Sequence, residues 1–372
     1  MKSKRPTVFV SSCGTSVLTN ESDNERRRLI NELANLREEA LSPEQRQTLD
    51  EHIQNRQHTL LETPHPDQIK KLSAELNGLL TYYGGAPKHT EGTPDHHILV
   101  VSDTYLGQKV GEVIESWLHS KGFNVQVWAP PGLVTSDRDS FRDAMTQLIQ
   151  RCEEELKGYS DNGYHVAFNL TGGFKSVQGF LQTLGMFYAD ESFYIFETGS
   201  LLSIPRLPIT LDASETVEKH LDTFRQFELG LEISLQDCTG ISDTLLIEHD
   251  GRAALSEWGE LIWQRSKDQF YSKQLLKPLD GIEYGLQFAK RVEKEGLTPR
   301  QLATLNERLD QLSLVAHGGG ANLKGLDFKP LKGNPKPPST HECDIWSSDE
   351  RRLFGHYETG VFVIDAIDRG LH

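Results

Sequence analysis

Apolar and amphipathic segments alternate along residues 96–197, and this alternation constrains the fold more than any other feature of the chain. A strand-length apolar run at 96–103 is followed by a segment of helical periodicity at 104–122, and this pair of patterns recurs until residue 197. Strands joined by helices of this length build a parallel sheet that is covered by helices on both faces. The pattern therefore predicts an α/β fold with a doubly wound, Rossmann-like sheet.

The stretches on either side extend the prediction to the whole chain. The run "TVFVSS" is typical of a first strand, and the charged stretch at 21–83 predicts a helical insertion after it, within a domain of residues 1–211. Residues 212–275 are expected to be mostly helical. Their acidic turn "EHDGR" before "AALSEWGELIW" fits the wing of a small winged helix, and a plain helical connector fits equally well. Residues 276–372, a helix followed by a run of strands, predict a separate small α+β domain.

The chain is acidic, and its charge is unevenly distributed. The formal net charge is −15, from 39 Lys and Arg against 54 Asp and Glu. Residues 276–372 hold 13 basic and 14 acidic residues, a balance of −1, so the remaining residues carry −14. This acidity argues against DNA as a partner, and the locally basic stretch is residues 317–341.

The composition points away from a membrane and from an oxidising compartment. No run approaches the roughly 20 apolar residues of a membrane helix, and the start of the chain lacks the apolar core of a secretory signal. The cysteines stand far apart without a CxxC pair, which argues against structural zinc and against a disulfide framework. We expect a cytoplasmic protein with no metal site and no membrane contact.

Three expected strand ends carry small, hydroxyl-bearing or basic residues: "SSCGTS" at 11–16, "SDTYLGQK" at 102–109 and "TGGFKS" at 171–176. The carboxyl ends of neighbouring parallel strands open onto one crevice, so these loops are expected to converge. Glycine amides, hydroxyls and Lys175 at a helix start would suit phosphate groups. An ordinary tight turn would need the same small residues. The spacing matches neither a P-loop nor a dinucleotide fingerprint.

Together with "AELNGLLTYYGG" and "VVSDTYLGQKVGEVIESWL", these loops resemble the CARF domain of CRISPR-associated proteins over residues 1–211. That domain is the sensor of cyclic oligoadenylate in type III interference. The resemblance implies a homodimer that binds a symmetric ring. The ring that we expect is cyclic tetra-adenylate, which would act as an activator and not as a cofactor. The residues implied in ligand contact are Ser11, Ser12, Cys13, Gly14, Thr15, Thr104, Gln108, Thr171, Gly172, Gly173, Phe174, Lys175 and Ser176.

The last part of the chain, with "KPLKG", "HECDIW" and "ERRLFGHYETGVFVIDAIDRGLH", resembles the RelE family of ribosome-dependent mRNA interferases. The resemblance implies metal-free cleavage through attack of the 2′-hydroxyl, with Arg352 and Arg369 stabilising the transition state. The family's strand lysines are replaced near Glu342 and Asp344, and its C-terminal tyrosine is not matched. Further candidates for charge and proton transfer are Lys329, Lys332, His341, His356 and His372.

These patterns predict an effector in which the cyclic ligand, bound to the sensor dimer, activates mRNA cleavage on ribosomes. The acidic insertion at 21–83 is a candidate contact for a ribosomal protein. Two other functions stay open at this level. One is a ring nuclease that cuts the cyclic ligand with Lys175, Ser11 and Ser12; the other is a transcription regulator using residues 240–265, whose acidity argues against binding to a DNA duplex.

Overall fold

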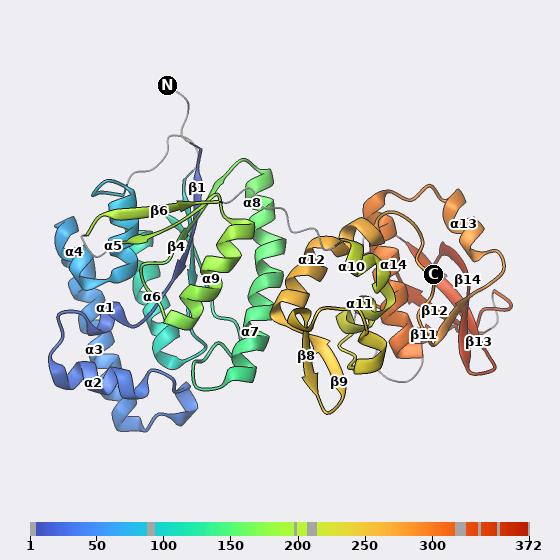
Figure 1. The fold of residues 1–372 in the computed structure, drawn as a ribbon, viewed down its shortest axis with the longest axis horizontal. Helices are drawn as coiled ribbons and strands as arrows, with labels where there is room; N and C mark the ends of the chain where they lie inside the picture. Colours follow the sequence, from blue (N-terminus) through green and yellow to red (C-terminus); the bar gives the residue numbers. More distant parts are fainter. Residues whose placement is uncertain are drawn as a thin grey trace. The chain divides into compact units, whose positions relative to one another are not determined.

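The computed structural model describes residues 5–87, 94–196, 199–206, 214–316, 325–333, 336–347 and 350–370. The chain divides into two compact units, Met1–Thr210 (blue to green in Figure 1) and Leu211–His372 (yellow to red). The boundary expected near residue 275 lies inside the second unit, and the division into sensor, connector and nuclease domains stays a prediction. Among the described helices, none combines the length and the apolar character needed to cross a bilayer.

The first unit contains the predicted doubly wound sheet. Its strand order is β3-β2-β1-β4-β5-β6. Five strands are parallel: β1 (Thr7–Ser12), β2 (His96–Val100), β3 (Asn124–Trp128), β4 (His165–Asn169) and β5 (Glu191–Ile195). An antiparallel edge strand that the sequence analysis did not predict, β6 (Leu201–Pro205), pairs with β5. The parallel α/β prediction is confirmed.

Helices occupy the predicted insertion and alternate with the later strands. Between β1 and β2 the chain forms α1 (Ser16–Thr19), α2 (Asn24–Leu33), α3 (Pro43–Glu62), α4 (Pro66–Leu72) and α5 (Ala74–Tyr82). The later helices are α6 (Tyr105–Ser120), α7 (Arg138–Arg151), α8 (Lys157–Asp161) and α9 (Lys175–Tyr188). Phe9, Leu99 and Phe193 share one core with the insertion helices and α6, while Val8 and Val10 are equally buried on the other face of the sheet. Both faces are therefore covered, as a parallel sheet requires.

The second unit begins with helices and a small antiparallel sheet. Its elements are α10 (Ser214–Lys219), α11 (Leu221–Glu228), β7 (Ile233–Ser234), β8 (Leu246–His249), β9 (Arg252–Leu255) and α12 (Glu257–Tyr271). The strand order is β7-β9-β8. Asp250 and Gly251 turn between β8 and β9 with φ of 50° and 75°, the positive values that a tight two-residue hairpin needs. The "EHDGR" motif thus forms a wing-like hairpin.

The rest of the second unit is a sheet packed on two helices. The helices are α13 (Phe288–Lys294) and α14 (Pro299–Ala316), and the strands are β10 (Ile282–Tyr284), β11 (Lys329–Pro330), β12 (His341–Asp344), β13 (Arg351–Glu358) and β14 (Val361–Arg369). The order is β10-β14-β13-β12-β11, with β10 parallel to β14 and the other pairs antiparallel. Leu353 and Ile367 pack on one face with Leu305 and Leu309 of α14. We call the other face, which carries Arg352, Phe354 and His356, the open face.

A buried polar network joins the two halves of this unit. Arg225 on α11 donates to both carboxylate oxygens of Asp310 on α14, over 2.5 and 3.1 Å, and Tyr271 donates to the same carboxylate over 2.5 Å. Asn306 on α14 accepts from the Leu276 amide over 3.0 Å and donates to the Tyr271 carbonyl over 2.8 Å. These hydrogen bonds connect α11 and the end of α12 to α14 within this unit.

Candidate functional site

The loops after β1 and β4 lie against each other at the carboxyl edge of the first sheet. A Cβ atom on Gly14 would stand 3.1 Å from the Cα of Gly173, and one on Gly173 would stand 2.8 Å from the Cβ of Ser12. Gly173 also has φ of +97°, a conformation that L side chains rarely adopt. Two of the predicted strand-end loops therefore do converge, and glycine is what allows their contact.

Glu75, which the sequence analysis did not select, packs between these two loops. Its carboxylate is fully buried at the start of α5 and accepts from the Gly14 amide over 2.8 Å and from the Ser16 hydroxyl over 2.6 Å. A Cβ on Gly172 would stand 2.1 Å from its Oε1, so the carboxylate fills the space that this glycine leaves free. A signal was present in the sequence, because Ser73 caps α5 and an acidic residue follows in the first turn.

Part of the predicted ligand set is buried and already engaged. The buried members are Ser11, Ser12, Cys13, Thr104 and Gly172. The Ser12 hydroxyl donates to the Gly172 carbonyl over 2.5 Å, and the Thr104 hydroxyl accepts from the Gly107 amide over 3.0 Å as the N-cap of α6. Burial, and after it the charge of Glu75, raises the pKa of the Cys13 thiol. In this conformation these side chains stabilise the loops and are not presented to solvent.

The other members are at least partly exposed, and all but Gln108, which lies on α6, belong to the β1 loop, the β4 loop or the first turn of α9. They are Gly14, Thr15, Gln108, Thr171, Gly173, Phe174, Lys175 and Ser176. Lys175 and Ser176 are exposed in the first turn of this 14-residue helix, and no side chain caps its N-terminus. Uncapped amide groups, the positive end of the helix dipole and a lysine together suit a phosphate group.

On the open face of the second unit, Arg352 is already paired. Its guanidinium contacts Glu342 over 2.8 Å and Asp344 over 3.1 Å, and its side chain is 18% exposed. The strand register places Arg352 beside Asp344 on β12 and Asp368 on β14. The two carboxylates, near the positions where the RelE resemblance implies lysines, thus pair with the arginine that we predicted to stabilise the transition state.

Beside Arg352, a cavity of about 520 Å³ on the open face gathers titratable side chains. His356 Nδ1 lies 2.9 Å from Asp365 Oδ2, and the Ser339 hydroxyl donates to the same oxygen over 2.7 Å. Lys336 pairs with Asp368 over 2.9 Å and stands 4.1 Å above the ring of Phe354. A carboxylate that holds one imidazole nitrogen orients the other for proton transfer. Asp365 was missed because a β-bulge brings it to this face.

The remaining predicted catalytic residues lie elsewhere. Arg369 pairs in register with Arg351, on the face opposite Arg352. Lys329 pairs with Asp327, and Lys332 is exposed in the loop after β11. His341 stacks on Phe328, and burial lowers its pKa. His372 lies outside the described residues. The structure therefore brings His356 and Arg352 to one face and leaves Arg369 and His341 off it.

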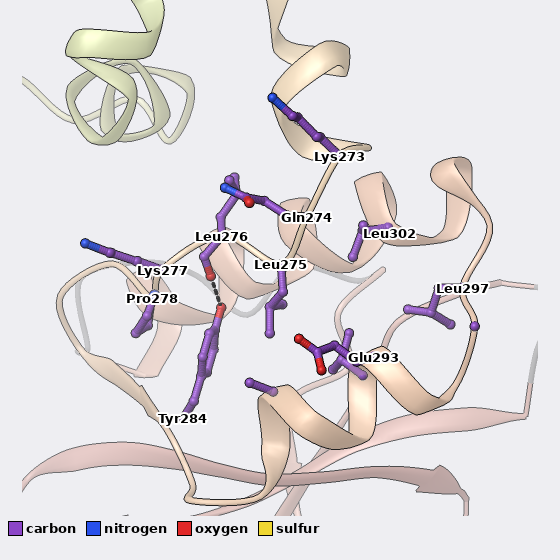
Figure 2. Close-up of a pocket in the computed structure, with 13 residues that line it drawn as sticks. Lys273, Gln274, Leu275, Leu276, Lys277, Pro278, Tyr284, Glu293, Leu297 and Leu302 are labelled. Atoms are coloured by element: carbon purple, nitrogen blue, oxygen red, sulfur yellow. Dashed lines mark hydrogen bonds between the residues drawn. The ribbon is translucent and has the colours of Figure 1, made fainter.

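A further cavity, of about 580 Å³, lies between α13 and the segment Lys273–Pro278 (Figure 2). The Tyr284 hydroxyl donates to the Leu276 carbonyl over 2.8 Å at its wall. Leu275, Leu297 and Leu302 give this cavity an apolar lining. No residue of the predicted sites lines it, so its size alone does not make it the candidate active site.

Comparison with known proteins links the first unit to one family. Residues 70–207 match the model of a CRISPR-associated protein family (Cas_APE2256). Over this range the chain is similar to CRISPR-associated proteins. The match supports a CRISPR-associated protein and covers Glu75 and the β4 loop. No curated protein matches the chain.

Proposed function

We propose that the chain is an effector of type III CRISPR defence, in which cyclic tetra-adenylate activates a ribosome-dependent mRNA endoribonuclease. The observation that carries the proposal is the convergence of the β1 and β4 loops beside the uncapped start of α9, in a region similar to CRISPR-associated proteins. The second unit supplies the nuclease, supported by its sheet and its open-face cavity.

The ligand half of the proposal rests on symmetry and on charge. A ring of four identical nucleotides has two-fold symmetry, so two copies of the first unit can offer it the same surface. Lys175, Ser176 and the amides at the start of α9 would contact phosphate, and Gly14 and Thr15 the adjacent ribose. Ligand binding changes the second unit only if it favours one of two states of the dimer.

The catalytic half needs no metal. His356 accepts the proton of the RNA 2′-hydroxyl at Nε2 while Asp365 holds Nδ1. The 2′-oxygen bonds to phosphorus, and the bond to the 5′-oxygen breaks, which leaves a 2′,3′-cyclic phosphate. The 5′-oxygen takes a proton from water, and the hydroxide so formed takes the proton that His356 accepted. Lys336 and Arg352 stabilise the charge that develops on phosphorus. Arg352 must release Glu342 or Asp344 to do so, and we assign that release to activation.

The test is cleavage of mRNA by the full chain, with and without ribosomes and with and without cyclic tetra-adenylate. Cleavage that requires both supports the proposal, and its absence refutes it. His356→Gln is expected to lower the cleavage rate about 10²- to 10⁴-fold, the usual contribution of a general base. Arg352→Ala should lower the rate as well, and Arg369→Ala, on the opposite face, should change it less. Equal rates in wild type, His356→Gln and Arg352→Ala would contradict the site assignment.

The same assay separates the alternatives. Linear products from the cyclic ligand alone would indicate a ring nuclease, but Ser11 and Ser12 are fully buried and engaged, which disfavours them as reacting groups. Salt-sensitive binding to duplex DNA would indicate a transcription regulator. The β8–β9 hairpin has the shape of a wing, but Glu248 and Asp250 are exposed on it and would repel phosphate.

A further inference from the structure

A third cavity in the second unit has basic but no acidic lining residues, in contrast to the acidic chain as a whole. Its volume is about 550 Å³. It lies at the start of α14 and is lined by Thr298, Arg300, Gln301, Thr304, Arg308, Ile345, Trp346 and Ser347. None of these lining residues is acidic, whereas the open-face cavity contains two aspartates. The cavity therefore concentrates positive charge.

Its two arginines stand on one face of α14, at positions 300 and 308 with Thr304 between them. Four-residue spacing brings such side chains into line along a helix. Among the described residues, neither arginine forms an ion pair with a carboxylate, whereas Arg225, Arg351 and Arg352 of the same unit each do. Neither cavity arginine is thus held in an ion pair by a described neighbour, and the nearby charge of Glu307 acts on Arg308 without pairing with it.

Arg308 is held in place before any ligand arrives. Its Nε donates to the Ile345 carbonyl over 3.3 Å, and its Nη1 donates to Gln311 over 2.8 Å. Gly325 approaches the guanidinium so closely that a Cβ there would stand 3.2 Å from both Nη atoms. Because its side chain is already ordered, binding an anion costs little conformational entropy.

The opposite wall is equally rigid. The Trp346 indole donates to the Gln301 carbonyl over 3.1 Å, and the Arg351 guanidinium lies 4.6 Å from the centre of its ring. Thr298 and Gln301 cap each other at the helix start, with bonds of 3.0 and 3.3 Å, so the local amides are occupied. The groups left to bind an anion are therefore the guanidinium groups of Arg300 and Arg308, near the positive end of the 18-residue helix α14.

We propose that this cavity binds a phosphodiester of the RNA backbone and holds RNA on the second unit. Guanidinium groups with hydroxyl and amide neighbours match the donor pattern that phosphate oxygens require. The choice of RNA over an acidic peptide rests on the proposed function, because the second unit acts on RNA. The phosphodiester belongs either to the single-stranded substrate or to ribosomal RNA, and two arms of the test separate these sources.

The first arm measures the affinity of the full chain for a short uracil oligonucleotide by fluorescence anisotropy across a range of salt. Because the cavity holds one phosphodiester, Arg300→Gln with Arg308→Gln should lower the slope of log K against log salt by about 0.7, the value for one phosphate contact with a single strand. Arg252→Gln, an exposed arginine on β9, is the matched control and should leave the slope unchanged. The second arm repeats the comparison by cosedimentation with ribosomes.

A lower slope in the first arm assigns the cavity to single-stranded RNA, and a loss confined to the second assigns it to ribosomal RNA. Unchanged binding in both arms overturns the proposal. Polyglutamate that displaces RNA at equal charge concentration also overturns it, in favour of an acidic peptide. Arg300→Gln alone, at an exposed position, decides the matter if the double variant does not fold. If the nuclease proposal fails and this one holds, wild type binds RNA without cleaving it, and the double variant still shows the lower salt slope.

Discussion

Replacing Gly172 with alanine tests the packing of the candidate ligand site most directly. The new Cβ would stand 2.1 Å from Glu75 Oε1 and 2.4 Å from its Cδ, so the carboxylate must move by about 1 Å to reach van der Waals contact. Glu75 then loses its hydrogen bonds from the Gly14 amide and the Ser16 hydroxyl. The Ser73 hydroxyl still donates to the carboxylate, whereas the Gly14 amide and the Ser16 hydroxyl are left without their acceptor. Because a buried polar group without a partner costs about 1–3 kcal/mol, we expect Gly172→Ala to destabilise the first unit by about 2–4 kcal/mol.

Hydrogen exchange of the β1 and β4 amides is the appropriate assay, because it reports opening of the first unit separately from the second. Gly179→Ala on α9 is the matched control. A Cβ there meets nothing within 4 Å, and alanine in a helix should stabilise by about 0.5–1 kcal/mol.

A double-mutant cycle with Glu75→Ala isolates the cause. With the carboxylate removed, Gly172→Ala should cost less than about 1 kcal/mol. A cost that is the same in both backgrounds would refute the reasoning, because the clash with Glu75 would not be its source.

Two further predictions concern stability. Arg225→Met should destabilise the second unit by about 3–5 kcal/mol in urea unfolding, because it leaves Asp310 buried without its partner. Asp222→Asn, which removes only the exposed partner of Arg225, should cost at most about 1 kcal/mol, and equal losses in the two variants would contradict the assignment. The second prediction concerns pH: the hydrogen bond between His165 and Glu191 is the main cause that raises the pKa of His165 above 6.5 and lowers that of Glu191 to about 2. The His165 contribution to stability is therefore complete below pH 6.5 and lost as the pH rises through its folded pKa, while that of Glu191 is present above pH 4.5 and lost toward pH 2. His165→Gln should flatten the stability profile of the first unit just above pH 6.5, and a profile identical to that of wild type would show that the pair contributes nothing.

Long periodic segments were predictable, and short edge strands were not. The alternation along residues 96–197 led to the strands and helices of the parallel sheet, and the runs around residues 341, 352 and 363 led to β12, β13 and β14. The three-residue strand β10 and the edge strand β6 were missed. Strands this short, or broken by serine and proline as in "LLSIP", carry too little alternation and depend on their neighbours for their conformation.

Of the three loops that the sequence predicted to converge, those after β1 and β4 do meet, because parallel strands place their carboxyl ends at one edge. The sequence also showed that basic and acidic residues nearly balance in residues 276–372. It did not determine which side chains at that edge face inward. Glu75 reaches Gly14 across 61 positions of the chain, and only the packing of α5 against β1 brings them together.

In the five-stranded sheet of the second unit, only the tertiary structure determined which residues each charged side chain contacts. The register across β12, β13 and β14 gives Arg352 its carboxylate partners and sends Arg369 to the opposite face. A register shift between Phe354 and Gly355 leaves Asp365 unpaired on β14 and turns it toward His356. Without the bulge, the alternation of side chains along β14 would place Asp365 and His356 on opposite faces of the sheet. The bulge arises from the pairing of two strands, so neither strand's sequence alone predicts it.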